Sequence, residues 1–176
     1  MEVQIRQEEI SDYTEVASTI ELAFQNEPLS DHQEHFLVER LRQASDFIPE
    51  LSLVALVEGQ IVGHIIFSKI LIQGATSLTT ALALAPVSVR PGFQGQGIGS
   101  CLIEAGHEIA RQLGFGSVIL LGHADYYPRF GYVPTTEFDI ELPFPAPPEN
   151  CLALELQPGA LKNASRRVVY PPVFFA

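Results

Sequence analysis

The alternation of apolar and polar residues predicts a strand followed by two helices at the start of the chain. Val3 and Ile5 alternate with polar neighbours, which is typical of a short, half-buried strand. Apolar residues then recur at helical spacing up to about Gln25, and Ser11-Asp12 is a suitable N-cap for this helix. The same spacing predicts a second helix over residues 31–44.

Three apolar segments follow and predict an antiparallel meander. The first two, residues 51–57 and 60–67, flank the turn Glu58-Gly59, so we expect a hairpin. The third covers residues 78–89 and contains Pro86. Because proline cannot donate to a strand ladder, we expect a bulge or a break in pairing there.

A glycine cluster then leads directly into a strongly amphipathic helix pattern. The apolar stripe runs from Ile98 to Leu113, and Gly114 stands where a helix commonly stops. The wholly apolar run over residues 117–121 predicts a buried strand. Strand, helix and strand together predict a right-handed βαβ unit.

The pattern is weaker in the last third of the chain. Residues 122–132 predict a short helical turn that ends at Gly131, and the alternation of Phe138 and Ile140 predicts a strand. Residues 151–156 predict another strand. The tail after it is apolar, so we expect it to pack back on the body of the protein.

Composition limits the class of protein. The 176 residues are enough for one domain with a real core, so we expect a single domain over 1–176. With 10 Lys and Arg against 21 Asp and Glu, the formal charge of −11 disfavours nucleic acid and anionic membranes as partners, and it weakly favours cationic substrates. We find neither a signal peptide nor an apolar run of membrane-spanning length, and we expect a cytoplasmic protein.

The potential metal ligands are sparse. Cys101 and Cys151 are far apart in apolar surroundings, which indicates buried free thiols in a reducing compartment. His32 and His35 are three residues apart on the expected second helix, but no third ligand is in view. We therefore expect no metal.

The glycine cluster favours binding of a phosphate group. Gly95, Gly97 and Gly99 allow a sharp turn that exposes backbone N–H groups, and the helix that follows adds the positive end of its dipole. The glycine spacing and the absence of an acidic residue about 20 positions later do not match a dinucleotide fingerprint. A Walker P-loop is excluded because no Gly-Lys-Ser/Thr follows the glycines.

Written as Gln94-x-x-Gly97-x-Gly99, the loop resembles the Arg/Gln-x-x-Gly-x-Gly/Ala signature of the GNAT superfamily of N-acetyltransferases. The preceding segment, residues 87–93, is similar to the strand and turn that precede the loop in that family. Residues 126–132 resemble the family's segment of aromatic, tyrosine and glycine residues. The order of the predicted elements also matches, so the resemblance covers most of the chain.

This resemblance implies a fold, a cosubstrate and a set of binding residues. The fold is α/β (α+β), with a central mixed, mostly antiparallel sheet of about six to seven strands, flanked by helices and splayed at the cofactor slot. The cosubstrate is acetyl-CoA, whose pyrophosphate is expected on the N–H groups of residues 94–100 and whose pantetheine arm is expected along residues 87–89. The expected cofactor-binding residues are Val87, Ser88, Val89, Gln94, Gly95, Gln96, Gly97, Ile98, Gly99 and Ser100.

The resemblance also implies a reaction. The acetyl group passes to a primary amine by direct attack in a ternary complex, and Tyr127 protonates the departing thiolate, which suits a phenol of pKa near 10. The backbone N–H at about Val89 is a candidate donor to the thioester oxygen. The acceptor is expected to be a small-molecule or peptide amine, and a homodimer stays open.

The general base is left open by the sequence. Many members of the family have a glutamate on the central strand, but residues 82–88 contain no carboxylate. The candidates are His64, His123 or a chain of water molecules to Asp125. The missing carboxylate also keeps an alternative function open, namely a non-catalytic acyl-CoA sensor or regulatory module.

Overall fold

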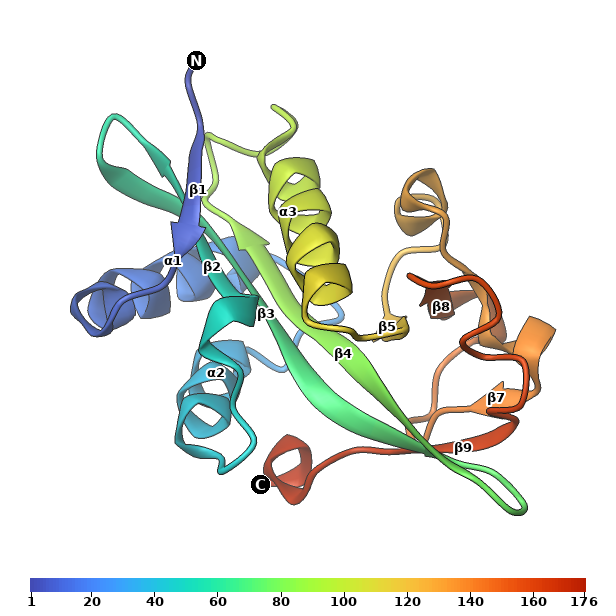
Figure 1. The fold of residues 1–176 in the computed structure, drawn as a ribbon. Coiled ribbons are helices and arrows are strands. Elements are labelled where there is room, and N and C mark those ends of the chain that lie inside the picture. Colours follow the sequence, from blue (N-terminus) through green and yellow to red (C-terminus); the bar gives the residue numbers. More distant parts are fainter. The chain divides into compact units, whose positions relative to one another are not determined.

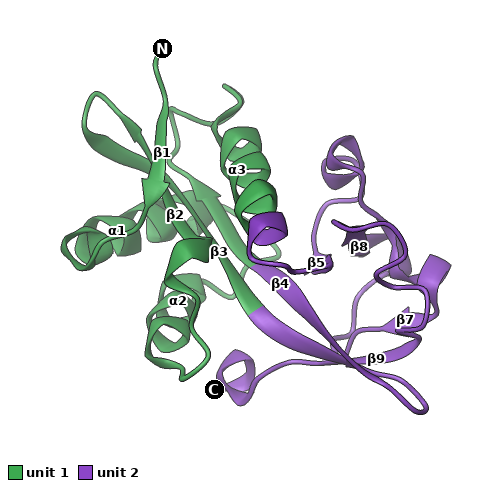
Figure 2. Ribbon diagram, viewed as in Figure 1, with its two compact units in different colours: residues 1–68, 85–109 green, residues 69–84, 110–176 purple.

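The computed structural model describes residues 1–176 (Figure 1). These residues form two compact units (Figure 2). Unit 1 contains residues 1–68 and 85–109, and unit 2 contains residues 69–84 and 110–176. The strands form a mixed, mostly antiparallel sheet of nine strands, two or three more than we expected. No helix has both the length and the apolar character needed to cross a membrane.

Unit 1 contains the strand order β1-β2-β3-β4. These strands are β1 (Gln4–Gln7), β2 (Ser52–Val57), β3 (Gln60–Gln73) and β4 (Leu78–Val89), the last two passing into unit 2. The pairs β1–β2 and β2–β3 are antiparallel, and Glu58 and Gly59 form the expected hairpin turn with positive φ. Strand β4 continues through Pro86, whose peptide bond with Ala85 is cis.

Helices cover both faces of these strands (Figure 1). They are α1 (Tyr13–Phe24), α2 (Glu34–Gln43) and α3 (Ile98–Gln112). A side chain at Gly63 would meet Leu102 of α3 at 3.0 Å, so this glycine lets α3 approach β3 closely. The next residue, His64, points to the other face, because successive side chains alternate across a strand.

Unit 2 extends the sheet from β4. Strand β5 (Ser117–Leu121) pairs in parallel with β4 at Leu82–Val118 and Ala83–Ile119, which confirms the predicted βαβ connection. Strand β8 (Cys151–Glu155) pairs antiparallel with β5, and β6 (Val133–Pro134) pairs with β8. Strand β9 (Arg166–Val169) pairs antiparallel with β3, and β7 (Ile140–Glu141) pairs in parallel with β9.

The remaining elements are short 3-10 helices. They are η1 (Ile10–Asp12), η2 (Pro49–Leu51), η3 (Tyr127–Phe130), η4 (Thr135–Phe138), η5 (Pro148–Asn150) and η6 (Pro172–Phe175). In unit 2, Tyr170 packs edge-on against Phe144 and Phe174 with ring centroids 4.8 and 5.0 Å away. Phe174 packs on the buried cluster around Ile119 and Val168, so the prediction for the apolar tail is confirmed.

Three local predictions are wrong, and one strand was not predicted. Helix α2 begins at Glu34 and not at Asp31, so His32 precedes it with φ 59°. The reason is a local turn in which the Asp31 carboxylate accepts the N–H of Gln33 at 2.9 Å. Phe138 is the last residue of the 3-10 helix η4 and does not lie in a strand. Asp139 follows in the left-handed conformation, which interrupts the strand that we expected.

The other two differences from the structure concern a thiol and a short strand. Cys101 is exposed and not buried, because it lies outside the apolar stripe of α3. Strand β9 was not predicted at all, because its sequence, Arg-Arg-Val-Val, is short and only one of its residues is buried.

A buried polar network connects four segments of unit 1. Arg42 of α2 donates to Glu8, and the Ser52 hydroxyl donates to the Glu8 carboxylate at 2.7 Å. Ser52 has only that one proton, so at the 3.0 Å contact the His64 Nε2 must carry a hydrogen and donate to the Ser52 oxygen. The His64 Nδ1 then has a lone pair without a hydrogen-bond partner.

Burial keeps His64 neutral. Its side chain is wholly buried, and desolvation, followed by the positive charge of Arg42, lowers its pKa to about 3. In the unfolded chain the same imidazole binds a proton below about pH 6.5. Between these two values the unfolded state binds more protons than the folded state, so the stability associated with His64 falls as the pH falls from about 6.5.

We therefore predict a pH-dependent difference between the wild type and His64→Gln. From about pH 6.5 to about pH 4.5, the free energy of unfolding of the wild type should fall more steeply, by up to about 1.4 kcal/mol per pH unit. Urea unfolding at a series of pH values measures both slopes. Parallel curves over this range would show that His64 is not held neutral by the fold.

Candidate active site

Three glycines shape the loop between β4 and α3. Gly92, Gly95 and Gly97 have φ of 89°, 72° and 85°, in the left-handed region that favours glycine. A side chain added at any of them would meet no atom within 4 Å, so conformation and not crowding requires glycine here. The backbone N–H groups of residues 94–100 donate to no backbone carbonyl, and they are free to bind an anion.

Two glutamine side chains hold the carbonyl groups of this loop. Gln94 Nε2 donates to the Val89 carbonyl at 2.9 Å, and Gln96 Nε2 donates to the Gly92 carbonyl at 2.8 Å. The Phe93 N–H donates to the Arg90 carbonyl at 3.0 Å. These bonds occupy the carbonyl groups of Val89, Arg90 and Gly92 and leave the N–H groups of the loop available to donate.

The start of α3 adds to the positive potential of the loop. The helix begins at Ile98, which is buried, and its first turn contains no acidic residue in a chain with a net charge of −11. The Cys101 N–H donates to the Gly97 carbonyl at 3.0 Å, so the glycine loop continues directly into the helix. Free N–H groups and the helix dipole together favour a bound phosphate.

The end of β4 has one edge bound to β3 and one edge facing away from it. The Arg90 N–H donates to the Val62 carbonyl of β3 at 2.8 Å. Because backbone groups alternate along a strand, the N–H groups of Val87 and Val89 point away from β3. The Val89 carbonyl lies on the same outer edge, where Gln94 occupies it. The Val89 N–H is therefore a donor directed away from the sheet partner.

Tyr127 lies in unit 2, at the start of η3, within a cluster of aromatic rings. Its ring packs edge-on against Tyr126 and Tyr132, with centroids 5.1 and 5.7 Å away. A side chain at Gly122 would meet the Tyr127 ring at 2.4 Å, so this glycine makes room for it. Burial, and to a smaller extent Tyr126, raises the pKa of Tyr127 well above its usual value near 10. The phenol is fully protonated at neutral pH.

The three candidate bases differ in their surroundings. His64 is wholly buried in the network with Ser52 and has no exposed surface from which to receive a proton from a substrate. His123 and Asp125 are exposed and lie between β5 and η3 in unit 2. Thus unit 1 contains all the expected cofactor-binding residues, and unit 2 contains Tyr127, His123 and Asp125.

One contact near the loop was not expected from the sequence. Arg90 Nε donates to the hydroxyl of Thr19 at 2.9 Å, and Thr19 is wholly buried in α1. The Thr19 hydroxyl lies 3.4 Å from the Ile61 carbonyl of β3. This contact fixes α1 to the end of β4, and no local pattern connects residues 71 positions apart.

The fold and the glycine loop are those of one class of acetyltransferases. A family model described as an acetyltransferase (GNAT) domain matches residues 49–134, which include β4, the glycine loop, α3 and η3. A solved GNAT family acetyltransferase from Brucella melitensis, in complex with acetyl-CoA, is 32% identical, with a TM-score of 0.77 and coverage of 98% of both chains. The chain belongs to the GNAT family of N-acetyltransferases.

Two Escherichia coli relatives place the chain within that family. It is 40% identical to the uncharacterized N-acetyltransferase YjhQ of strain K12 over 65% of this chain and 64% of YjhQ, so the match spans less than two thirds of that relative. It is 30% identical to YhbS of strain K12 over 76% of this chain and 78% of YhbS. The crystal structure of YhbS in complex with CoA superposes with a TM-score of 0.87, at 25% identity, over 99% of this chain and 92% of that chain.

Proposed function

We propose that this protein transfers an acetyl group from acetyl-CoA to a primary amine, as one N-acetyltransferase domain over 1–176. The observation that carries the proposal is the glycine loop, in which free N–H groups meet the start of a helix. The pyrophosphate of CoA binds these N–H groups, so the loop needs no lysine. The complexes of the YhbS and Brucella relatives with CoA and acetyl-CoA support this assignment.

The outer edge of β4 binds the pantetheine arm in this proposal. The pairs between β4 and β5 are at Leu82 and Ala83, before Pro86, and Val87 and Val89 direct their backbone groups away from β3. An amide-containing arm can pair with such an edge as an additional strand. Because the Arg90 N–H binds β3, the Val89 N–H points away from β3 and can donate to the thioester oxygen.

The reaction proceeds by direct attack in a ternary complex. The amine nitrogen forms a bond to the thioester carbon, and the Val89 N–H stabilises the negative charge on the oxygen. The C–S bond then breaks, the thiolate takes a proton from the Tyr127 hydroxyl, and the amine loses a proton to the general base. Solvent then returns a proton to Tyr127. An acyl-enzyme on Cys151 is disfavoured, because burial raises the pKa of its thiol.

The general base is a water molecule or His123. His64 is a poor candidate, because it is wholly buried and a group with a pKa of about 3 binds protons too weakly to deprotonate an amine. His123 is exposed and can exchange protons with solvent. A water path to Asp125 serves the same purpose.

Release of the CoA thiol, measured with a panel of amines, amino acids and lysine peptides, tests the proposal. We expect thiol release that depends on an amine acceptor. Binding of CoA without release in the presence of any acceptor would contradict an enzyme and favour the sensor. Stabilisation by NAD or ATP alone, in a thermal unfolding assay, would contradict a CoA-binding protein altogether.

We predict that Gly97→Val weakens binding of CoA while the protein stays folded. Valine is strained at φ 85°, so the substitution changes the direction of the N–H groups, but its side chain meets no neighbour within 4 Å. Gly59→Val is the matched control, because Gly59 has φ 80°, is equally uncrowded and lies in the β2–β3 turn. Calorimetric titration should show a loss of affinity of about tenfold or more for Gly97→Val alone. Equal affinities of the two variants for CoA would show that the loop is not part of the binding site.

We predict that Tyr127→Phe lowers kcat by about 100-fold while the Kd for CoA changes little, because general acid catalysis is lost. Tyr126→Phe is the matched control, since Tyr126 is the adjacent phenol and packs against Tyr127. Steady-state thiol release and calorimetry measure kcat and Kd. If Tyr127→Phe changes only the affinity for CoA, Tyr127 is a packing residue and not the acid.

A further inference from the structure

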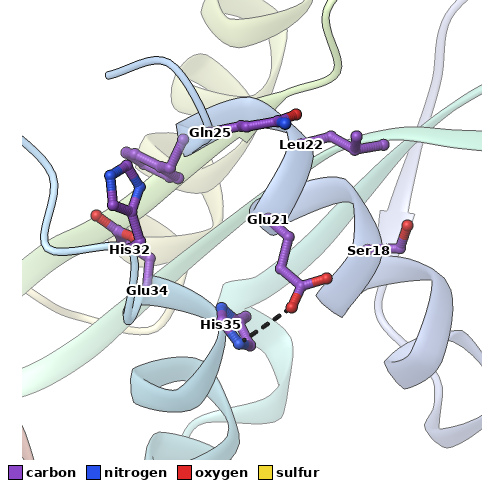
Figure 3. A pocket seen from close by; sticks show the side chains of 8 residues that line it. Ser18, Glu21, Leu22, Gln25, His32, Glu34 and His35 are labelled. Atoms are coloured by element: carbon purple, nitrogen blue, oxygen red, sulfur yellow. Dashed lines mark ion pairs between the residues drawn. The ribbon is translucent and has the colours of Figure 1, made fainter. Parts of the chain in front are cut away.

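A pocket of about 440 Å³ lies between α1 and α2 in unit 1 (Figure 3). Four of its residues, Ser18, Glu21, Leu22 and Gln25, share one face of α1 and its C-terminus at helical spacing. The other side of the pocket comes from the segment before α2 and from its first turn. The residues on that side are His32, Glu34 and His35, and Phe24 completes the lining.

Carboxylates are the only side chains of this pocket that carry a charge at neutral pH without further protonation, and its two histidines are charged only when protonated. Its lining includes two carboxylates, Glu21 and Glu34, and neither lysine nor arginine. Glu21 extends from α1 toward His35, whose Nε2 lies 3.3 Å from the carboxylate (Figure 3). The Ser30 hydroxyl donates to Glu34. These contacts hold the two carboxylates in place at the pocket. A cation is favoured there and an anion is repelled.

The pocket also has an apolar part that faces solvent. Leu22 is 39% exposed although it lies on the pocket side of α1, and Phe24 also contributes to the lining. A purely polar ligand would leave this surface exposed to water. An aliphatic chain that carries a positive charge matches both parts of the lining.

The helix that forms this pocket is fixed to the strand of the proposed acetyl-CoA site. The hydroxyl of Thr19, the neighbour of Ser18, accepts a hydrogen bond from Arg90 Nε at 2.9 Å. Arg90 directly follows Val89 in the sequence. Two independent features thus coincide on α1: a pocket suited to an aliphatic cation, and a buried contact to the end of β4.

We infer that this pocket binds the acceptor, and that the acceptor is an aliphatic amine with a second positive charge. The inference rests on the proposed function and specifies its substrate class. The second ammonium group binds at Glu21 and Glu34, and the alkyl chain contacts Leu22. The reacting amine must be neutral to attack the thioester, so the carboxylates bind the other, non-reacting ammonium group. An acceptor with a carboxylate at that end is disfavoured by repulsion.

Three acceptors with the same five-carbon chain test this inference: cadaverine, pentylamine and ε-aminocaproate, which end in an ammonium, a methyl and a carboxylate group. We expect kcat/KM to be highest for cadaverine and lowest for ε-aminocaproate. Glu21→Gln and Glu34→Gln should each lower kcat/KM for cadaverine about two- to fivefold, as for exposed ion pairs. The same variants should change kcat/KM for pentylamine much less. Glu39→Gln, which removes an exposed carboxylate from α2 outside the lining, is the control and should leave the cadaverine value unchanged.

A binding measurement separates this inference from the proposed function. Cadaverine is titrated calorimetrically into the protein saturated with CoA, and we expect binding that is weakened in the Glu21 and Glu34 variants. If CoA itself does not bind, the proposed function fails. If CoA binds but cadaverine does not, or if cadaverine binds no more tightly than pentylamine, the pocket is not the site for a dicationic acceptor and the proposed function stands.

Discussion

The direction of the backbone N–H groups after β4 is the constraint on which the account depends. Left-handed conformations at Gly92, Gly95 and Gly97 turn the chain, and the side chains of Gln94 and Gln96 hold its carbonyls. The N–H groups that are left without a partner are those at the start of α3. An anion can therefore bind without a basic side chain, even in a chain with a net charge of −11.

Contacts on both faces of the sheet support this geometry. Gly63 allows α3 to approach β3, which fixes the helix that continues from the loop. On the other face, Thr19 of α1 binds Arg90 at the end of β4. Loop, strand end and pocket thus lie within unit 1 and are joined by these contacts, which is a physical basis for positioning an acceptor relative to a cofactor.

The features that are encoded locally could be predicted from the sequence. The bounds of β4 and β5, the start of α3 at Ile98 and the stop at Gly131 follow from β-branched runs and glycines. The start of α2 could not be predicted, because the Asp31 side chain stabilises a turn where the apolar spacing predicted a helix. The network of Glu8, Arg42, Ser52 and His64 and the Thr19–Arg90 bond join residues that are distant in the sequence, so no local pattern marks them. The pairing of the short strand β9 with β3 also joins residues that are distant in the sequence, so it too could not be predicted.

The most direct test of the central claim observes the loop N–H groups themselves. Amide NMR spectra are recorded while CoA is added, with NAD and ATP as controls. The account predicts that CoA shifts the amide signals of residues 94–100 strongly and that NAD and ATP shift them little. If CoA binds and leaves those signals unchanged, the backbone cradle does not hold the cofactor and the account is wrong.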